Sequence, residues 1–204
     1  IVEETEASKR ATDLANYLEL GETALESDNV EEAEQWFNKA LELDGKNEQA
    51  WIGKALAVQG SSTTQRSRFE ESLKCIEKAL QINPDSEAVK RAKSKVIFRE
   101  RIWMAHLAGQ EWGMAVDICN TWMQASAESL DILGAYGLDG KVKQQAAPHV
   151  ASAVNYLERA LALDPTDQIT LLSMIKCLTE APGGRQFGDP APYKQRLRLF
   201  KLRS

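Results

Sequence analysis

One stretch of the chain, Phe37-Asn38-Lys39-Ala40-Leu41-Glu42-Leu43-Asp44, decides the fold because its pattern of residue types occurs three times. Residues 76–83 and residues 157–164 repeat its order: apolar, polar, basic, Ala, Leu, any residue, apolar, then Asp or Asn. A similarity that returns within one chain indicates an internal structural repeat. Ala33, Phe37 and Ala40 are spaced i, i+4 and i+7, which predicts a helix with one apolar face.

Each copy is followed by a stop and then by a capping residue. The stops are Gly45, Pro84 and Pro165, and the capping residues are Asn47, Ser86 and Asp167. Pro and Gly do not continue a helix well, and Asn, Ser and Asp side chains accept from the free N–H groups of a first turn. We therefore predict a new helix after each copy.

The residues before the first copy predict a partner helix. Apolar and small residues recur there at helical spacing: Tyr17, Leu20, Gly21, Ala24 and Leu25. Asp28-Asn29 then interrupts the pattern and can cap the helix that carries Phe37. Two short amphipathic helices cannot bury their apolar faces alone, whereas a stack of such pairs buries a continuous core.

These residues resemble the tetratricopeptide repeat (TPR) family. The matching positions are Tyr17, Leu20-Gly21, Ala24, Ala33, Phe37, Ala40 and Gly45. Residues 14–47 make one unit of the family's 34-residue period. The resemblance implies an all-α, right-handed superhelical solenoid of helix-turn-helix repeats.

We predict an array over residues 1–184, followed by a basic linker and capping helix at 185–204. The units are placed at 14–47, 48–86, 96–126 and 127–166, with a partial unit at 168–180. Insertions between paired helices are predicted at 60–68 and 137–149, because the second and fourth units are longer than the family's period. The third unit is inferred from a long helix at 87–108 and a partner helix at 110–126.

Charge and composition exclude several classes of function. The formal net charge is −5, and the segment 185–204 carries six basic residues against Asp189, so the remainder is acidic. An acidic body repels phosphates, so we expect no nucleic-acid binding. No long uncharged apolar run spans a membrane, and Ile1-Val2-Glu3-Glu4 lacks the features of a signal peptide. We expect a cytoplasmic protein or a soluble domain of a larger one.

No residues of the sequence predict catalysis, a cofactor or a metal site. His106 lies among apolar residues and is expected to be a packing residue, and His149 has no partner that the sequence identifies. Cys75, Cys119 and Cys177 are far apart and set among apolar residues, which favours small core residues over a disulfide or metal motif. We therefore expect a chain that is not an enzyme.

The TPR resemblance implies that the first helix of each pair lines a concave groove. The groove positions that it assigns are Leu18, Glu22, Leu25, Gln49, Ile52, Leu56, Gln59, Met104, Glu128 and Asp131. They form an apolar strip with acidic points, which favours a protein or peptide with apolar anchors and some basic residues. The alternative is that the chain itself covers the strip, since exposed apolar stripes are uncommon in monomers.

Three functions fit this pattern. The first is a protein-interaction adaptor or scaffold that binds a peptide or helix of a partner in the groove. The second is a self-assembly module, and hence a homo-oligomer. The third is a non-catalytic regulatory domain of a larger protein.

Overall fold

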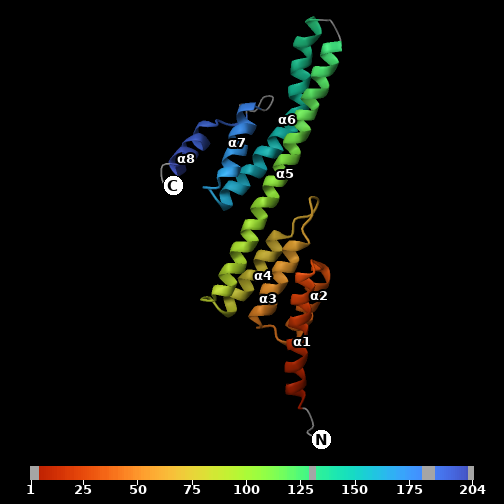
Figure 1. Ribbon diagram of the computed structural model, residues 1–204, viewed down its shortest axis with the longest axis vertical. Coiled ribbons are helices and arrows are strands. Elements are labelled where there is room, and N and C mark those ends of the chain that lie inside the picture. The colour runs from red at the N-terminus through yellow and green to blue at the C-terminus, as the bar shows by residue number, and fades with distance from the viewer. Residues whose placement is uncertain (1–4, 129–131, 181–186, 202–204) are drawn as a thin grey trace. The chain divides into compact units, whose positions relative to one another are not determined.

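A computed structural model of the chain describes residues 5–128, 132–180 and 187–201; the side chains at 122–128, 132–139, 141 and 200–201 are outside the description. The helices are α1 (Glu6–Glu26), α2 (Val30–Leu43), α3 (Glu48–Gly60), α4 (Phe69–Ile82), α5 (Glu87–Glu128), α6 (Ile132–Leu163), α7 (Gln168–Glu180) and α8 (Ala191–Lys201). Figure 1 shows them in chain order, and the described residues include no strand. The predicted all-α fold of helical repeats is confirmed. None of the described helices is both long and apolar enough to cross a membrane.

Three interhelical turns have the same construction. In each turn, the residue after the helix donates its backbone N–H to the carbonyl of the Ala in the repeated stretch. The bonds join Asp44 to Ala40, Asn83 to Ala79 and Asp164 to Ala160. The next helix is capped by a side chain that accepts from its first turn, Asn47 from Ala50 at 2.9 Å, Ser86 from Val89 at 3.3 Å and Asp167 from Thr170 at 3.0 Å. The predicted caps at Asn47, Ser86 and Asp167 are confirmed, whereas Asn29 begins α2 without a side-chain capping bond.

Each of these turns is also held by a side chain from an earlier helix. Arg10 Nη2 donates to the Leu43 carbonyl at 2.7 Å. The Glu48 carboxylate accepts from the Asn83 amide and the Ser86 hydroxyl. The Arg101 guanidinium forms ion pairs with Asp164 and Asp167. In the first two cases the helix supports the end of its own partner helix. The third contact assigns the same role to α5, which supports the end of α6.

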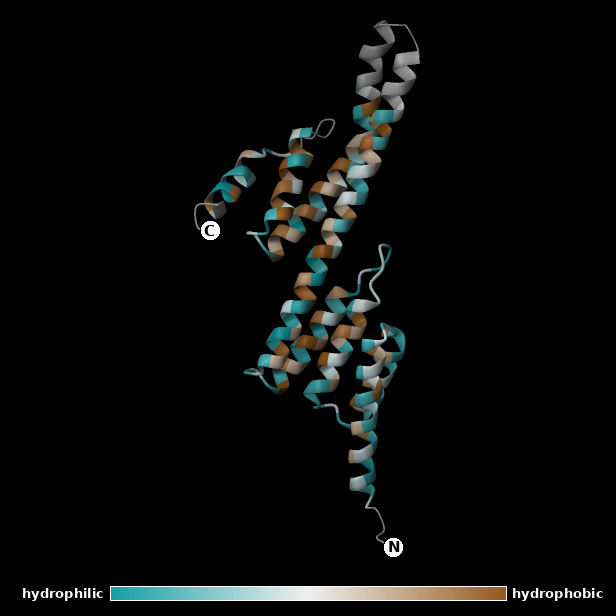
Figure 2. Ribbon diagram, viewed as in Figure 1, coloured by the Kyte–Doolittle hydropathy of each residue, from teal (hydrophilic) through white to brown (hydrophobic). Residues whose placement is uncertain are grey.

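The chain divides into two compact units, Ile1–Arg99 and Glu100–Ser204, and the boundary falls within α5. In the first unit α1 packs on α2, α2 on α3 and α3 on α4, and α1 also contacts α3. Phe37 is fully buried against Ala24, Ala33 and Ala57. Figure 2 shows the hydrophobic residues of these helices gathered where the helices face one another.

Two glycines make room for the Phe37 ring. A Cβ added at Gly21 would lie 2.7 Å from the ring, and one added at Gly53 would lie 2.2 Å from it. Neither distance is compatible with a real side chain, so the close approach of α1 and α3 to α2 requires glycine at both positions.

The second unit is built on an antiparallel pair formed by α5 and α6. Glu111 Oε2 lies 2.7 Å from His149 Nδ1, and Arg101 reaches the turn that follows α6. Helix α7 packs on α6, and α8 packs on α7. The core of this unit consists mainly of Val150, Leu157, Leu171, Met174 and Leu178.

The structure corrects the predicted helix breaks in this half of the chain. We predicted a break at Gly109, between helices at 87–108 and 110–126, and an insertion at 137–149. Instead α5 is continuous through Gly109, and α6 is continuous through Pro148. A helical Gly costs about 1 kcal/mol and Pro about 3 kcal/mol, and packing between two long helices offsets such costs. The boundaries drawn at 96–126 and 127–166 therefore do not correspond to two short hairpins.

The three cysteines differ in accessibility, and their reactivity is a first test of the core. Cys75 and Cys177 are buried, whereas Cys119 is partly exposed. Burial raises the pKa of all three thiols, that of Cys177 to about 11. Because a thiol must also be accessible to react, we expect a pulse of iodoacetamide at about pH 8 to label the partly exposed Cys119 first.

Intact-mass spectrometry measures this labelling. In the native protein one adduct should form well before the second and third, and Cys119→Ser should remove the fast adduct. Simultaneous labelling of all three thiols in the folded protein would contradict the burial of Cys75 and Cys177.

Candidate functional site

The predicted groove residues of the first unit lie together on α1 and α3. Leu18, Glu22 and Leu25 follow one side of α1, and the matching side of α3 carries Gln49, Ile52 and Leu56. The Gln49 side chain donates to Glu22 Oε1 at 2.7 Å, so the two rows meet. We call these six residues the α1–α3 face.

The opposite sides of the same helices explain why this face is turned outward. Gly21 and Ala24 of α1 are buried, as are Ala50, Gly53 and Ala57 of α3. Small residues on that side bring α1 and α3 close to α2, and the 3.6-residue period then directs the α1–α3 face away from α2.

The α1–α3 face is partly exposed in the part of the chain that the structure describes. Leu18 and Leu25 pack with one side against the Phe37 cluster and remain partly exposed, and Ile52 and Leu56 are also partly exposed. Glu22 and Gln49 are exposed. The face is therefore an apolar strip with a polar pair across it, a surface that can hold apolar anchors of a partner.

Two other predicted groove residues, Gln59 and Met104, do not join this face, and the side chains of two more are outside the description. Gln59 is 6% exposed, and its Oε1 accepts no hydrogen bond within the described part of the chain. Met104 is 3% exposed and lies in the second unit, where the pairing of α5 with α6 determines which side of α5 is buried. The side chain of Glu128 and all of Asp131 lie outside the described residues. The candidate site therefore includes neither Gln59 nor Met104.

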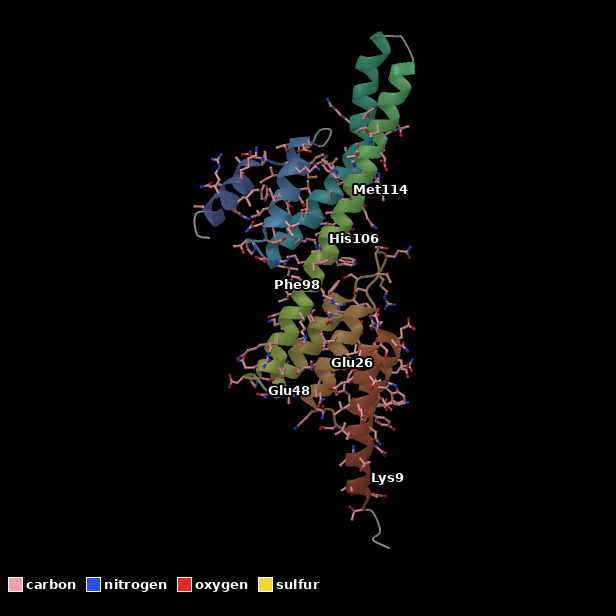
Figure 3. The ribbon with its side chains drawn as sticks, in the orientation of Figure 1. Lys9, Glu26, Glu48, Phe98, His106 and Met114 are labelled. Atoms are coloured by element: carbon pink, nitrogen blue, oxygen red, sulfur yellow. The ribbon has the colours of Figure 1, made fainter. Side chains whose placement is uncertain are left out.

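The α1 side of the face is acidic. Glu19, Glu22 and Glu26 are all exposed, and Figure 3 labels Glu26 near the end of α1. Carboxylates beside an apolar strip attract basic groups and repel phosphates, which agrees with the chemistry expected for the groove.

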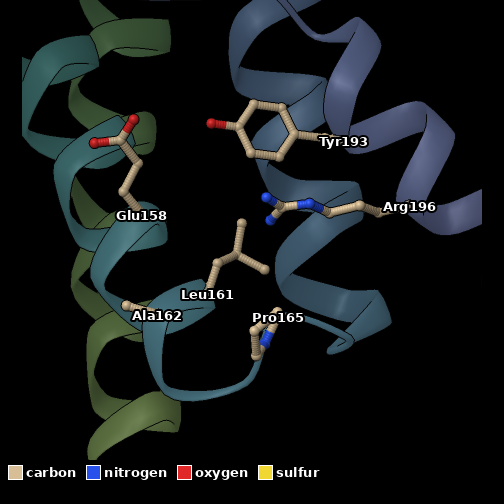
Figure 4. A pocket seen from close by; sticks show the side chains of 6 residues that line it. All are labelled: Glu158, Leu161, Ala162, Pro165, Tyr193 and Arg196. Carbon is tan, nitrogen blue, oxygen red and sulfur yellow. The ribbon is translucent and has the colours of Figure 1, made fainter.

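A second concave site lies between α6 and α8, and sequence reasoning did not predict it. Figure 4 shows its lining, and it encloses about 340 Å³. The Tyr193 hydroxyl points toward Glu158, and the Arg196 guanidinium carbon lies 5.9 Å from the centroid of the Tyr193 ring. Burial and the Glu158 carboxylate raise the pKa of Tyr193. The sequence signal was the i, i+3 pair of an aromatic and a basic residue in the tail.

A third hollow is lined by the turn before α3 and by the end of α4. Its lining consists of Gly45, Lys46, Trp51, Lys78, Gln81 and Ile82, around a space of about 450 Å³. The Trp51 indole N–H is used within the turn, because it donates to the Gly45 carbonyl at 3.0 Å. The two lysines make this hollow basic, and its groups have no arrangement for acid–base catalysis.

Each of the two histidines has a polar side-chain partner nearby. His106 is exposed and lies 3.1 Å from the side-chain amide of Gln110, one turn along α5. His149 faces Glu111 across the α5–α6 pair. Within the described residues no three His, Cys, Asp or Glu side chains are placed to hold a metal ion.

Comparison with known proteins adds one match. A family model described as tetratricopeptide repeat matches residues 14–47, which coincide with the first predicted unit and contain most of α1 and all of α2. No curated protein matches the chain.

Proposed function

This chain carries a tetratricopeptide repeat, and from that premise we propose that it is a protein-interaction adaptor whose α1–α3 face binds a peptide or helix of a partner. Repeats of this kind are generally protein-interaction modules. The observation that carries the proposal is the partly exposed strip of Leu18, Leu25, Ile52 and Leu56 beside the Glu22–Gln49 pair.

The strip has the composition of a small binding surface. Apolar groups that are partly exposed before binding are desolvated when a partner's side chains cover them, which contributes about 25 cal/mol per Å² of apolar area. The polar pair at the edge then restricts the partner's orientation. This combination supports binding of an amphipathic segment better than binding of a small metabolite, because the strip is a partly exposed apolar surface with one polar pair beside it.

Replacing Ile52 and Leu56 with Glu is expected to weaken peptide binding by at least about tenfold, since apolar anchors usually dominate such interfaces. Peptides selected with the parent protein from a random phage-displayed library serve as the probe. Fluorescence anisotropy measures their affinity for the parent and for Ile52→Glu/Leu56→Glu. Leu20→Glu is the matched control, because Leu20 is 42% exposed and lies on the other side of α1.

Thermal unfolding separates lost binding from lost folding. If Ile52→Glu/Leu56→Glu unfolds, Glu22→Lys/Gln49→Lys replaces it, because both side chains are exposed. Equal affinity of the parent and the folded variants, or failure of the parent to select any peptide, would rule out the α1–α3 face as the binding site.

Self-association is a second candidate, and a different surface favours it. Ile169 and Leu172 of α7 are 72% and 54% exposed and lie on one side of that helix. Light scattering tests it: a dimer that Ile169→Ser/Leu172→Ser converts to a monomer would establish self-assembly, and a monomeric parent would exclude it.

A further inference from the structure

The start of α5 repeats part of the register of α3, because the two helices share three buried positions. Helix α3 follows the cap Asn47 and buries its third, sixth and tenth residues, which are Ala50, Gly53 and Ala57. Helix α5 follows the cap Ser86 and also buries its third, sixth and tenth residues, which are Val89, Ala92 and Val96. The residues of α5 that correspond to Ile52, Leu56 and Gln59 are therefore Arg91, Lys95 and Phe98.

These three residues form one exposed row on α5. At about 100° per residue, Arg91, Lys95 and Phe98 fall within an arc of about 60°. Arg91 and Lys95 are exposed, and Phe98 is 53% exposed and labelled on α5 in Figure 3. Arg91 donates to the Glu87 carbonyl at 3.3 Å, and neither cation forms an ion pair within the described part of the first unit. We call Arg91, Lys95 and Phe98 the α5 row.

The start of α5 is adjacent to α3 within the first unit. The Ser86 hydroxyl and the Asn83 amide both donate to the carboxylate of Glu48, the first residue of α3. The Glu22–Gln49 bond joins α1 to α3 near the same end of α3. In the first unit the start of α3 therefore contacts both α1 and the turn that begins α5.

Charge is segregated between these helices. Residues 5–83 carry 15 acidic and 9 basic side chains, whereas residues 87–99 carry five basic side chains against Glu87 alone. Glu19, Glu22 and Glu26 are exposed on α1, whereas Arg91 and Lys95 occupy the positions of α5 that correspond to the apolar Ile52 and Leu56 of α3.

We propose that the first unit binds a partner segment with opposite charges on its two sides. Its apolar anchors contact Ile52 and Leu56, its acidic residues contact Arg91 and Lys95, and its basic residues contact Glu22. The ligand is an amphipathic protein segment and not a nucleic acid, because the α1 carboxylates repel phosphates. This inference rests on the proposed function and adds the partner's charge pattern to it.

Charge reversal of the α5 row tests the proposal. Peptides selected from a random library with the parent are expected to carry apolar residues with Asp or Glu on one side and Lys or Arg on the other. Arg91→Glu/Lys95→Glu should bind these peptides about tenfold more weakly, because two attractive pairs become repulsive. Selection repeated with this variant should return peptides with Lys or Arg on both sides.

The matched control is Lys90→Glu/Lys93→Glu. It makes the same change in net charge on the same helix, but both side chains are exposed and project away from the α5 row. Its affinity for the parental peptides should stay within about twofold of the parent's, since distant exposed charges are screened by salt. Circular dichroism confirms that both variants fold.

Each other outcome overturns the proposal, and the outcomes separate it from the proposed function. Selected peptides without acidic residues, or with equal affinity for parent and Arg91→Glu/Lys95→Glu, refute the charge pattern alone, provided that Ile52→Glu/Leu56→Glu still abolishes binding. Peptides insensitive to Ile52→Glu/Leu56→Glu refute both. A labelled RNA oligomer that binds the parent and is lost with Arg91→Glu/Lys95→Glu would assign the cations to nucleic acid instead.

Discussion

Replacing Phe37 with Ala is expected to lower the free energy of unfolding of the first unit by about 4 kcal/mol. The ring is fully buried and is enclosed by α1, α2 and α3, so its removal leaves a cavity that the flanking glycines cannot fill. Chemical denaturation followed by circular dichroism and tryptophan fluorescence measures the change. Trp36 reports on the first unit, because it packs against the same cluster.

Gly53→Ala tests the same contact by adding a methyl group on α3 that faces the Phe37 ring. Its Cβ would lie 2.2 Å from the ring of Phe37, and overpacking of this kind costs about 1–3 kcal/mol. Combining Gly53→Ala with Phe37→Leu should cost less than the sum of the two single changes, because the smaller side chain makes room for the added methyl group. The control is Gly109→Ala, which meets no atom within 4 Å in α5 and should stabilise the protein by about 1 kcal/mol.

The outcomes distinguish a tight three-helix contact from a loose one. Additive costs in the double variant would mean that Gly53 and Phe37 do not touch. A loss below about 1 kcal/mol for Phe37→Ala would place Phe37 outside a well-packed core. Either result would contradict the arrangement of α1, α2 and α3.

The sequence predicted this part of the fold because its signals are local. The Ala33–Phe37–Ala40 spacing places three side chains on one side of α2, and all three are fully buried. The caps at Asn47, Ser86 and Asp167 follow from short side chains next to helix stops, and each makes its expected bond. Local geometry decides such features before tertiary packing does.

The second half of the chain could not be predicted in the same way. Gly109 and Pro148 are local signals for helix ends, yet both lie inside continuous helices. Those helices pair over a long length through contacts such as Glu111 with His149, which are distant in sequence and follow no repeat period. Tertiary contacts of this kind outweigh a helix propensity of a few kcal/mol.

Six predicted groove residues of the first unit share a face, whereas Met104, predicted in α5, does not belong to it. The TPR resemblance assigned Leu18, Glu22 and Leu25 of α1, and Ile52 and Leu56 of α3, to one groove, and these residues lie on adjacent sides of the two helices. Met104 was assigned by extending the repeat through α5, where the true register begins at the Ser86 cap and exposes Arg91 and Lys95. That cap was visible in the sequence, and counting from it would have identified the α5 row.

Arg68→Ala is expected to destabilise the first unit by about 2 kcal/mol. The Arg68 guanidinium forms two bonds to Glu34, at 2.7 and 2.9 Å, two to Glu71, at 2.8 and 2.7 Å, and one to Ser61 at 2.8 Å. The side chains of Arg68 and Glu34 are only 16% and 19% exposed. Removing the cation leaves the largely buried Glu34 carboxylate unpaired beside that of Glu71, so the loss exceeds that of a surface ion pair.

The same change should alter the acid sensitivity of the first unit. The bonds from Arg68 hold the pKa of Glu71 below its usual value in the folded state. A lowered folded-state pKa contributes stability that is present above the unfolded pKa, about 4.3, and is lost as the pH falls through the folded value. The stability difference between the parent and Arg68→Ala should therefore be largest at neutral pH and should shrink below about pH 4.

Urea denaturation at a series of pH values tests this, with Arg66→Ala as the matched control. Arg66 lies in the same loop and is exposed, and it makes none of these side-chain bonds to Glu34 or Glu71. Hydrogen exchange adds a local readout, because residues 61–67 lose the anchor at Ser61 only in Arg68→Ala. Equal stability of the two variants, or a difference that does not change with pH, would mean that the ion pairs of Arg68 with Glu34 and Glu71 do not stabilise the folded state. The loop between α3 and α4 would then be fixed by its backbone bonds alone.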